Sequence, residues 1–168
     1  MPTVLGIDPG TRHCGVAVVA GPLERVYWAE DIRLREGDAQ ARVLACKSRL
    51  RALVAQWQPQ GIAIEQFAWE GHSTTGFQEM NWLVGLCLDL GHDLPIPATV
   101  RLFTVNAWRA QIVGRPLRGT AGKRTSATVV GARLGHVFRG PGYHEADAAG
   151  VALALYDQMT TRCLSSSA

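Results

Sequence analysis

Four side chains with the chemistry of metal ligands stand at the ends of apolar segments. Asp8 and Glu65 each follow a short apolar run, while His144 and Asp147 open a segment with helical spacing. Residues three apart on a helix project from one face, so His144 and Asp147 would point the same way. A carboxylate after a buried run is costly unless it is paired or binds a cation. Three converging carboxylates therefore favour Mg²⁺ or Mn²⁺.

Each of the four residues also has a simpler explanation. Asp8 precedes Pro-Gly and could be a turn residue, and Glu65 could be a solvated strand end. His144 could be a polar residue at a helix start, and Asp147 could complement the helix macrodipole. Their joint spacing, with each residue at the end of a different apolar element or on one helix face, favours a shared site.

The elements that would position these residues follow from the apolar periodicity. Because a meander followed by β-α-β crossovers yields a mixed sheet, the pattern predicts an α/β fold with a five-stranded sheet and helices on both faces. Pro9-Gly10 predicts a type II turn with positive φ at Gly10. Strands are expected at 3–8, 15–19, 25–34, 62–64 and 99–104, and helices at 39–57, 76–91, 108–113, 121–134 and 144–159.

Length and composition predict one globular domain over 1–161 and a short flexible tail over 162–168. The 168 residues are 47% hydrophobic and 18% charged. The chain lacks an apolar run of roughly 20 residues and a charged n-region before an apolar stretch, so we expect a cytoplasmic protein without a membrane partner. The four cysteines are widely spaced, which argues against a zinc site or a disulfide framework.

The distribution of charge predicts a polyanion-binding surface. The net charge is only +3, but residues 94–143 contain no acidic side chain. A second basic cluster lies on the helix expected over 39–57. Each phosphate contact releases counterions, so such segregation suits DNA, although a solvated basic face would look the same. The basic residues are Arg101, Arg109, Arg115, Arg118, Lys123, Arg124, Arg133 and Arg139, and then Arg42, Lys47, Arg49 and Arg51.

Three segments together resemble the signature segments of the RuvC family of Holliday-junction resolvases, within the ribonuclease H-like superfamily. They are Gly6-Ile7-Asp8-Pro9-Gly10-Thr11, Ile62-Ala63-Ile64-Glu65-Gln66 and His144-Glu145-Ala146-Asp147-Ala148. The resemblance covers residues 4 to about 156. It implies a ribonuclease H-like fold and a crossover junction endodeoxyribonuclease that acts on branched DNA, the four-way junction, in recombination and repair.

The resemblance also implies a two-metal mechanism with two Mg²⁺ ions per site, for which Mn²⁺ would substitute. By analogy Asp8 would bridge both ions, Glu65 and Asp147 would each hold one, and His144 would complete the ligand set. A two-fold symmetric junction implies a homodimer. A branch-migration helicase is a further partner that the family implies.

The same resemblance predicts DNA contacts. Arg109 and Lys123 match two family lysines that contact phosphates near the cut, and Arg118 and Arg124 are expected to bind DNA from the same basic stretch. Phe67 and Trp69 follow Glu65-Gln66, where family members carry aromatics that wedge into the junction. Packing of one of these two rings in the core is the alternative.

The region 67–92 departs from the family pattern. Asn81-Trp82-Leu83-Val84-Gly85 replaces the usual Gln-Ala-Arg-Gly of a helix that often forms the dimer interface. Two other functions therefore stay open. One is a ribonuclease H-like nuclease that acts on RNA or on other branched DNA, and the other is a catalytically silent scaffold that binds junctions.

Overall fold

The computed structural model describes residues 1–21, 25–34, 37–66, 74–94, 96, 98–115, 117, 119–139 and 143–165. In this part of the chain five strands form one sheet in the order β3-β2-β1-β4-β5. The strands are β1 (Thr3–Asp8), β2 (His13–Ala20), β3 (Arg25–Arg33), β4 (Gly61–Gln66) and β5 (Thr99–Thr104). The helices are α1 (Ala39–Trp57), α2 (Thr74–Asp89), the 3₁₀ helix η1 (Leu90–Asp93), α3 (Val105–Val113), α4 (Gly119–Leu134) and α5 (His144–Ser165).

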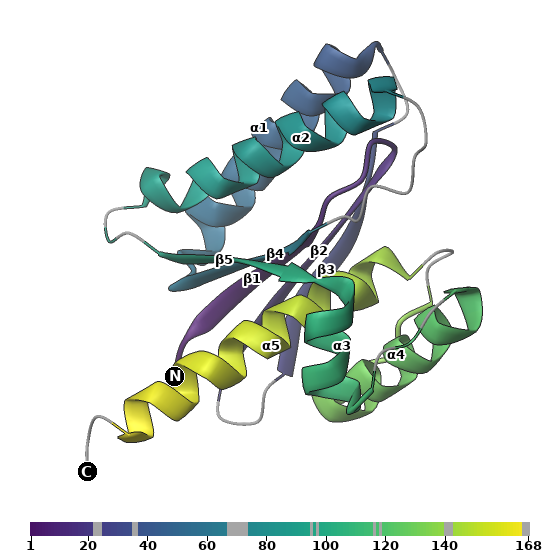
Figure 1. Ribbon diagram of the computed structural model, residues 1–168. Coiled ribbons are helices and arrows are strands. Elements are labelled where there is room, and N and C mark those ends of the chain that lie inside the picture. Colours follow the sequence, from purple (N-terminus) through teal and green to yellow (C-terminus); the bar gives the residue numbers. More distant parts are fainter. Residues whose placement is uncertain are drawn as a thin grey trace.

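The sheet is mixed, as predicted. β1 pairs antiparallel with β2, and β2 pairs antiparallel with β3. β1 pairs in parallel with β4, and β4 with β5. Helices α1 and α2 cover one face, and α3, α4 and α5 lie on the other (Figure 1). The α/β class and the helices on both faces are therefore confirmed.

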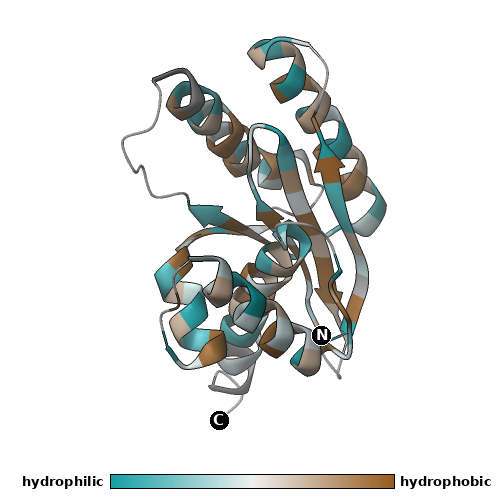
Figure 2. Ribbon diagram, turned by 90° about the vertical axis from the view of Figure 1, so that its right-hand side faces the viewer, coloured by the Kyte–Doolittle hydropathy of each residue, from teal (hydrophilic) through white to brown (hydrophobic). Residues whose placement is uncertain are grey.

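Alternation along the strands divides the core into two halves. Leu5, Ile7, Ile62 and Ile64 pack toward α1 and α2, whereas Val4 and Ala63 pack toward α5. Apolar segments accordingly run along the strands between the two helical layers (Figure 2). Side chains alternate between faces with a period of two. By this parity the next residue of each strand, Asp8 in β1 and Glu65 in β4, belongs to the α5 face.

Helix α5 approaches the sheet closely because glycine occupies the contact points. A Cβ at Gly6 would lie 1.9 Å from the Ala148 carbonyl oxygen, and one at Gly15 would lie 2.1 Å from the His144 carbonyl oxygen. Both glycines lie on adjacent strands, since Asp8 pairs with Gly15. The start of α5 is therefore held against the end of β1, where Asp8 lies.

Two local predictions differ from the structure. The φ of Gly10 is not in the left-handed region, so the predicted type II turn is wrong. Glycine is needed there for space, because a Cβ would lie 2.1 Å from the His13 carbonyl oxygen. Helix α5 continues to Ser165, so it includes part of the tail that was predicted over 162–168, and 166–168 lie outside the described residues. Among the described residues, no helix is long and apolar enough to span a membrane.

Candidate metal centre

Three carboxylates from three elements meet at one edge of the sheet. Asp8 ends β1, Glu65 lies near the end of β4, and Asp147 lies in the first turn of α5. One oxygen from each lies within 4.8 Å of the others. All three residues are buried, with exposed fractions of 8%, 8% and 1%. The structure thus brings together the three carboxylates that the sequence singled out.

His144 lies at the edge of this trio. Its Nδ1 is 2.8 Å from Asp8 Oδ2 in a hydrogen bond. That bond is the main reason why the pKa of His144 is raised, with the negative charge of Asp8 adding to it and burial opposing it. In the structure His144 is therefore a hydrogen-bond partner of Asp8. Its role as a metal ligand stays a prediction.

The electrostatics of the trio fit a bound cation. Burial, followed by the charges of Asp8 and Asp147, raises the pKa of Glu65 well above its ordinary value. Burial and Asp8 also raise the pKa of Asp147. Asp147 Oδ2 is buried and accepts no hydrogen bond from the described residues, although the Lys123 ammonium is 3.5 Å away. Mutually repelling, desolvated oxygens of this kind are the donor set that hard divalent ions prefer.

Helix α3 supports two of the three carboxylates through consecutive residues. Trp108 Nε1 donates to Glu65 Oε2 at 2.7 Å, and the indole is fully buried. Arg109 donates to Asp147 Oδ1 at 3.1 Å and to the Leu117 carbonyl oxygen at 3.0 Å. Because a metal-binding carboxylate depends on such outer partners for its orientation, α3 positions the site.

Trp108 is a site residue that the sequence did not reveal. Its ring fits against α5 because residue 150 is glycine, where a Cβ would come within 2.5 Å of the ring. The signal in the sequence was only its place beside Arg109. A tryptophan at a helix start is more often core, and Trp108 is core as well as a hydrogen-bond donor.

The predicted DNA contacts occupy different environments. Arg109 is 4% exposed with its guanidinium on Asp147, Lys123 lies beside Asp147, and Arg124 is exposed. The binding of phosphate by these side chains stays a prediction. Three further predicted contacts, Phe67, Trp69 and Arg118, lie outside the described residues.

A second histidine lies beside the centre and was also missed. The rings of His13 and His144 are stacked, with centroids 5.6 Å apart and an angle of 11° between their planes. His13 Nδ1 is 2.9 Å from Asp31 Oδ2. His13 and Asp31 come from the paired strands β2 and β3. The two pairs, His13 with Asp31 and His144 with Asp8, therefore lie side by side.

The basic cluster of α1 is not part of this site. Arg42 Nη2 donates to both carboxylate oxygens of Glu79 of α2, at 2.8 and 2.9 Å, and Arg49 pairs with Glu30 of β3. These cations are therefore neutralised by acids that are distant in the sequence. The prediction that this cluster forms a polyanion-binding surface is not supported for Arg42 and Arg49.

A sheet of this order, with carboxylates at the ends of β1 and β4 and on the last helix, defines a ribonuclease H-like fold. Comparison with solved structures confirms it. The chain matches a "Thermus thermophilus RuvC structure" with a TM-score of 0.74 and 26% identity, over 95% of this chain and 97% of that one. It also matches "T. thermophilus RuvC in complex with Holliday junction substrate" with a TM-score of 0.76 and 24% identity, over 95% and 96%.

Sequence comparison identifies the family. The family model described as "Crossover junction endodeoxyribonuclease RuvC" matches residues 4–155. The chain therefore belongs to the RuvC family. A curated relative from Xanthomonas campestris pv. campestris, with the same description, is 30% identical over 102 residues. That alignment covers 57% of this chain and 58% of the relative, so the similarity spans little more than half of the relative's length.

Proposed function

We propose that this protein is a structure-selective endonuclease that resolves Holliday junctions by metal-dependent hydrolysis of two opposed phosphodiesters, in DNA recombination and repair. The observation that carries the proposal is the buried trio of Asp8, Glu65 and Asp147, whose oxygens lie within 4.8 Å of one another in a chain of the RuvC family. A catalytically silent scaffold would not need to keep three desolvated carboxylates together, because their repulsion costs stability.

Asp8, Glu65, Asp147 and His144 would hold two Mg²⁺ ions, with Mn²⁺ as a substitute. When bound, such ions activate water and stabilise the leaving oxygen of an in-line displacement. The chain's own groups orient the ligands: Trp108 holds Glu65, and Arg109 holds Asp147. Lys123 is close enough to Asp147 to meet a phosphate that enters the centre, and positive charge there favours both binding and the transition state.

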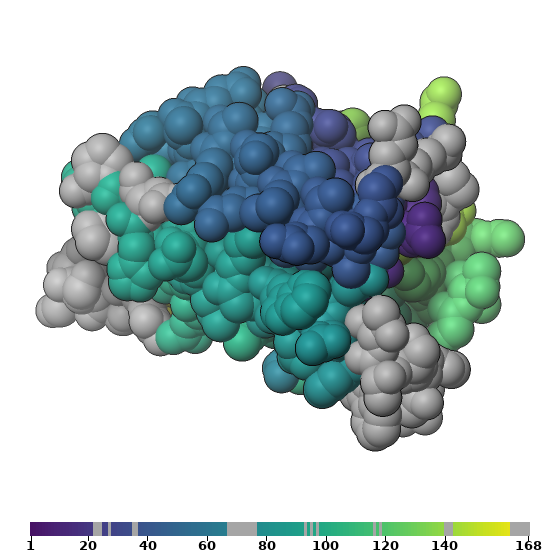
Figure 3. All heavy atoms as spheres, turned by 90° about the horizontal axis from the view of Figure 1, so that it is seen from above, coloured from purple at the N-terminus to yellow at the C-terminus, as the bar shows by residue number. Residues whose placement is uncertain are grey.

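Symmetric cutting requires two active sites, so the working form would be a homodimer. Helix α2 is suited to the contact because it carries partly exposed apolar side chains, Phe77 at 42%, Trp82 at 47% and Leu88 at 39%. Figure 3 shows the face that α1 and α2 present. A cytoplasmic location and a branch-migration helicase as a further partner belong to the same proposal.

The experiment that tests the proposal compares substrates. Purified protein with Mg²⁺ or Mn²⁺ should make paired symmetric nicks in a synthetic four-way junction and leave linear duplex intact. An RNA–DNA hybrid and a flap substrate test the rival nuclease activities. Equal cutting of linear duplex, or no cutting with either metal, would refute the resolvase function.

Asp8→Asn separates catalysis from binding. The substitution removes one charge while it keeps the shape of the side chain, so cleavage should be abolished. Junction binding should persist or improve, because a charge that repels phosphate is lost. Loss of junction binding would instead assign Asp8 a structural role. Asp38→Asn, at the exposed N-cap of α1, is the matched control and should cut normally.

A further inference from the structure

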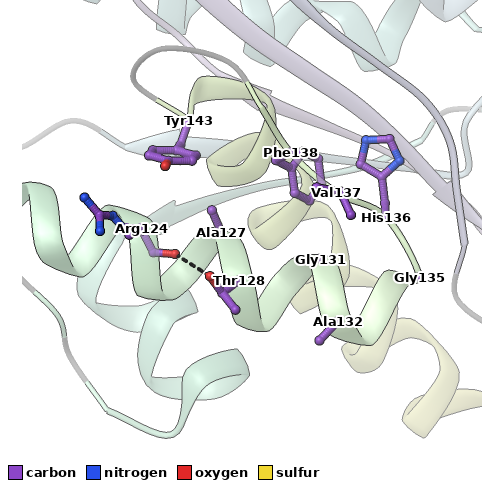
Figure 4. A pocket seen from close by; sticks show the side chains of 10 residues that line it. All are labelled: Arg124, Ala127, Thr128, Gly131, Ala132, Gly135, His136, Val137, Phe138 and Tyr143. Carbon is purple, nitrogen blue, oxygen red and sulfur yellow. Dashed lines mark hydrogen bonds between the residues drawn. The ribbon is translucent and has the colours of Figure 1, made fainter.

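A cavity of about 420 Å³ lies between α4 and the segment that leads into α5. One wall is a stripe along α4 that includes Arg124, Ala127 and Thr128. The facing wall includes Phe138 and Tyr143, and Figure 4 shows these rings across from the helix. The lining is mostly apolar, with a few polar groups, which is the composition of a small-ligand site.

The facing wall is fixed by backbone contacts. His136 N–H donates to the Gly131 carbonyl oxygen at 2.9 Å. Glycine at 131 permits this approach, because a Cβ would lie 2.4 Å from the His136 carbonyl oxygen. The His136 ring then packs edge-on against Phe138, with centroids 4.6 Å apart. The cavity is thus bounded by packed residues on both sides.

Tyr143 links the cavity to the candidate metal centre. Its φ is +57°, a left-handed conformation that is uncommon for a bulky residue and that concentrates at functional sites. Its carbonyl oxygen accepts the N–H of Asp147 at 3.0 Å, and it directly precedes His144. A group in the cavity would therefore lie next to the backbone that carries two proposed ligands.

The opposite wall of the cavity belongs to α4, the helix that also carries Lys123. Arg124 follows Lys123, whose ammonium is 3.5 Å from Asp147 Oδ2. Among the described residues that line the cavity none is acidic, and the sequence has no acidic side chain over 94–143. The cavity thus combines aromatic rings, apolar walls and the Arg124 guanidinium, and its Tyr143 directly precedes the proposed ligand His144. Aromatic rings and arginine are the groups on which nucleobases stack.

We infer that this cavity receives a nucleobase of the DNA strand held in the metal centre, with Tyr143 as the stacking surface and Arg124 as the contact to the base edge or to its phosphate. The inference rests on the proposed function. It implies that this cavity determines which bases at the crossover the nuclease prefers to cut beside. Extruding a base is least costly where pairing is already disturbed, as at a crossover.

Photo-crosslinking tests the inference directly. A series of four-way junctions is prepared, each with a single 5-iododeoxyuridine at a different position near the crossover. Each junction is bound to the protein in EDTA and irradiated, and the crosslinked residues are identified by mass spectrometry. In the wild type we expect a crosslink to Tyr143, His136 or Phe138 from one position. Ala132→Phe, at an exposed lining position of α4, fills the cavity and should lower that yield about tenfold, the factor for one lost base stack. Ala52→Phe, exposed on α1, is the matched control.

A second variant and a second readout guard against misfolding. Thr128→Leu narrows the cavity from the neighbouring turn, and both variants should also flatten the dependence of cleavage on the bases at the crossover. Crosslinks that map only elsewhere, or a yield unchanged in both variants, would overturn the nucleobase site while junction binding stays intact. Absence of junction binding by the wild type would overturn the proposed function and this inference with it.

Discussion

Trp108 Nε1 donates a 2.7 Å hydrogen bond to Glu65 Oε2, and both groups are buried. The donor comes from α3 and the acceptor from β4, and these two residues are 43 positions apart in the chain. Arg109, the next residue of α3, donates to Asp147 of α5. A single short helix therefore orients two of the three carboxylates, and its residues are as much part of the centre as the proposed ligands.

Trp108→Phe should weaken metal binding without unfolding the protein. The hydrogen bond from Trp108 lowers the pKa of Glu65, so its loss raises that pKa further and strengthens the competition of protons with metal. Loss of an outer partner typically costs about 10–100-fold in affinity or activity. Calorimetric titration with Mn²⁺ measures the affinity, and excess Mn²⁺ should restore cleavage.

Trp82→Phe is the matched control, because Trp82 is 47% exposed on α2. It should leave the affinity for Mn²⁺ unchanged. Equal affinities of Trp108→Phe and wild type would show that the indole only fills space.

Glu65→Gln should stabilise the metal-free protein at neutral pH. The pKa values of Glu65 and Asp147 are raised in the folded state, mainly by burial. Above the ordinary carboxyl pKa the folded state then binds more protons than the unfolded state, so the free energy of unfolding falls as pH rises toward the folded pKa. His144 has the same sign, because the stability from its raised pKa is lost as pH rises through that value.

Thermal unfolding in EDTA at several pH values measures this effect. The melting temperature of Glu65→Gln should decline less steeply with pH than that of the wild type. Each kcal/mol by which their free energies of unfolding differ should separate the two melting temperatures by about 2–4 °C. Mg²⁺ should raise the melting temperature of the wild type more than that of the variant. Glu145→Gln, the same change on the residue beside His144, should behave as the wild type. A lower melting temperature for Glu65→Gln at every pH would contradict the prediction.

Lys123 and Arg109 should differ in the salt dependence of DNA binding. Lys123→Ala removes a half-exposed cation and should lower the slope of log affinity against log salt by about 1. Arg109→Ala should leave the slope nearly unchanged, because its guanidinium is buried on Asp147. That variant should instead lose about 3–5 kcal/mol of stability, since Asp147 loses its buried partner. Fluorescence anisotropy at several salt concentrations decides between a DNA contact and a carboxylate partner.

Gly6→Ala should be among the most disruptive single-methyl changes in the chain. The new Cβ would lie 1.9 Å from the Ala148 carbonyl oxygen, so α5 must move away from β1. We expect a loss of about 3 kcal/mol in urea unfolding, together with loss of metal binding. Gly85→Ala, in the middle of α2, is the control, because a Cβ there meets no atom of the described residues within 4 Å. This substitution should raise the free energy of unfolding by about 0.5–1 kcal/mol.

Much of the fold could be predicted because the strands are short apolar runs bounded by turn residues. β1, β4 and β5 and helix α1 have the expected bounds within one residue or two, since apolar runs ended by turn residues have few other solutions. The turn at Gly10 was predicted wrongly for a physical reason. Pro-Gly favours a positive φ in isolation, but here the glycine is needed for the close approach of the His13 carbonyl.

By itself the sequence determined which carboxylates form the centre, because Asp8 and Glu65 each follow a buried run of the same parity on strands that pair in parallel. Only the tertiary structure decided what surrounds them. Three contacts there join residues that are distant along the chain: Trp108 with Glu65, Arg109 with Asp147, and the stacked rings of His13 and His144. Such contacts depend on how closely α3 and α5 dock, and that distance is set by the glycines between packed backbones, which local periodicity does not encode.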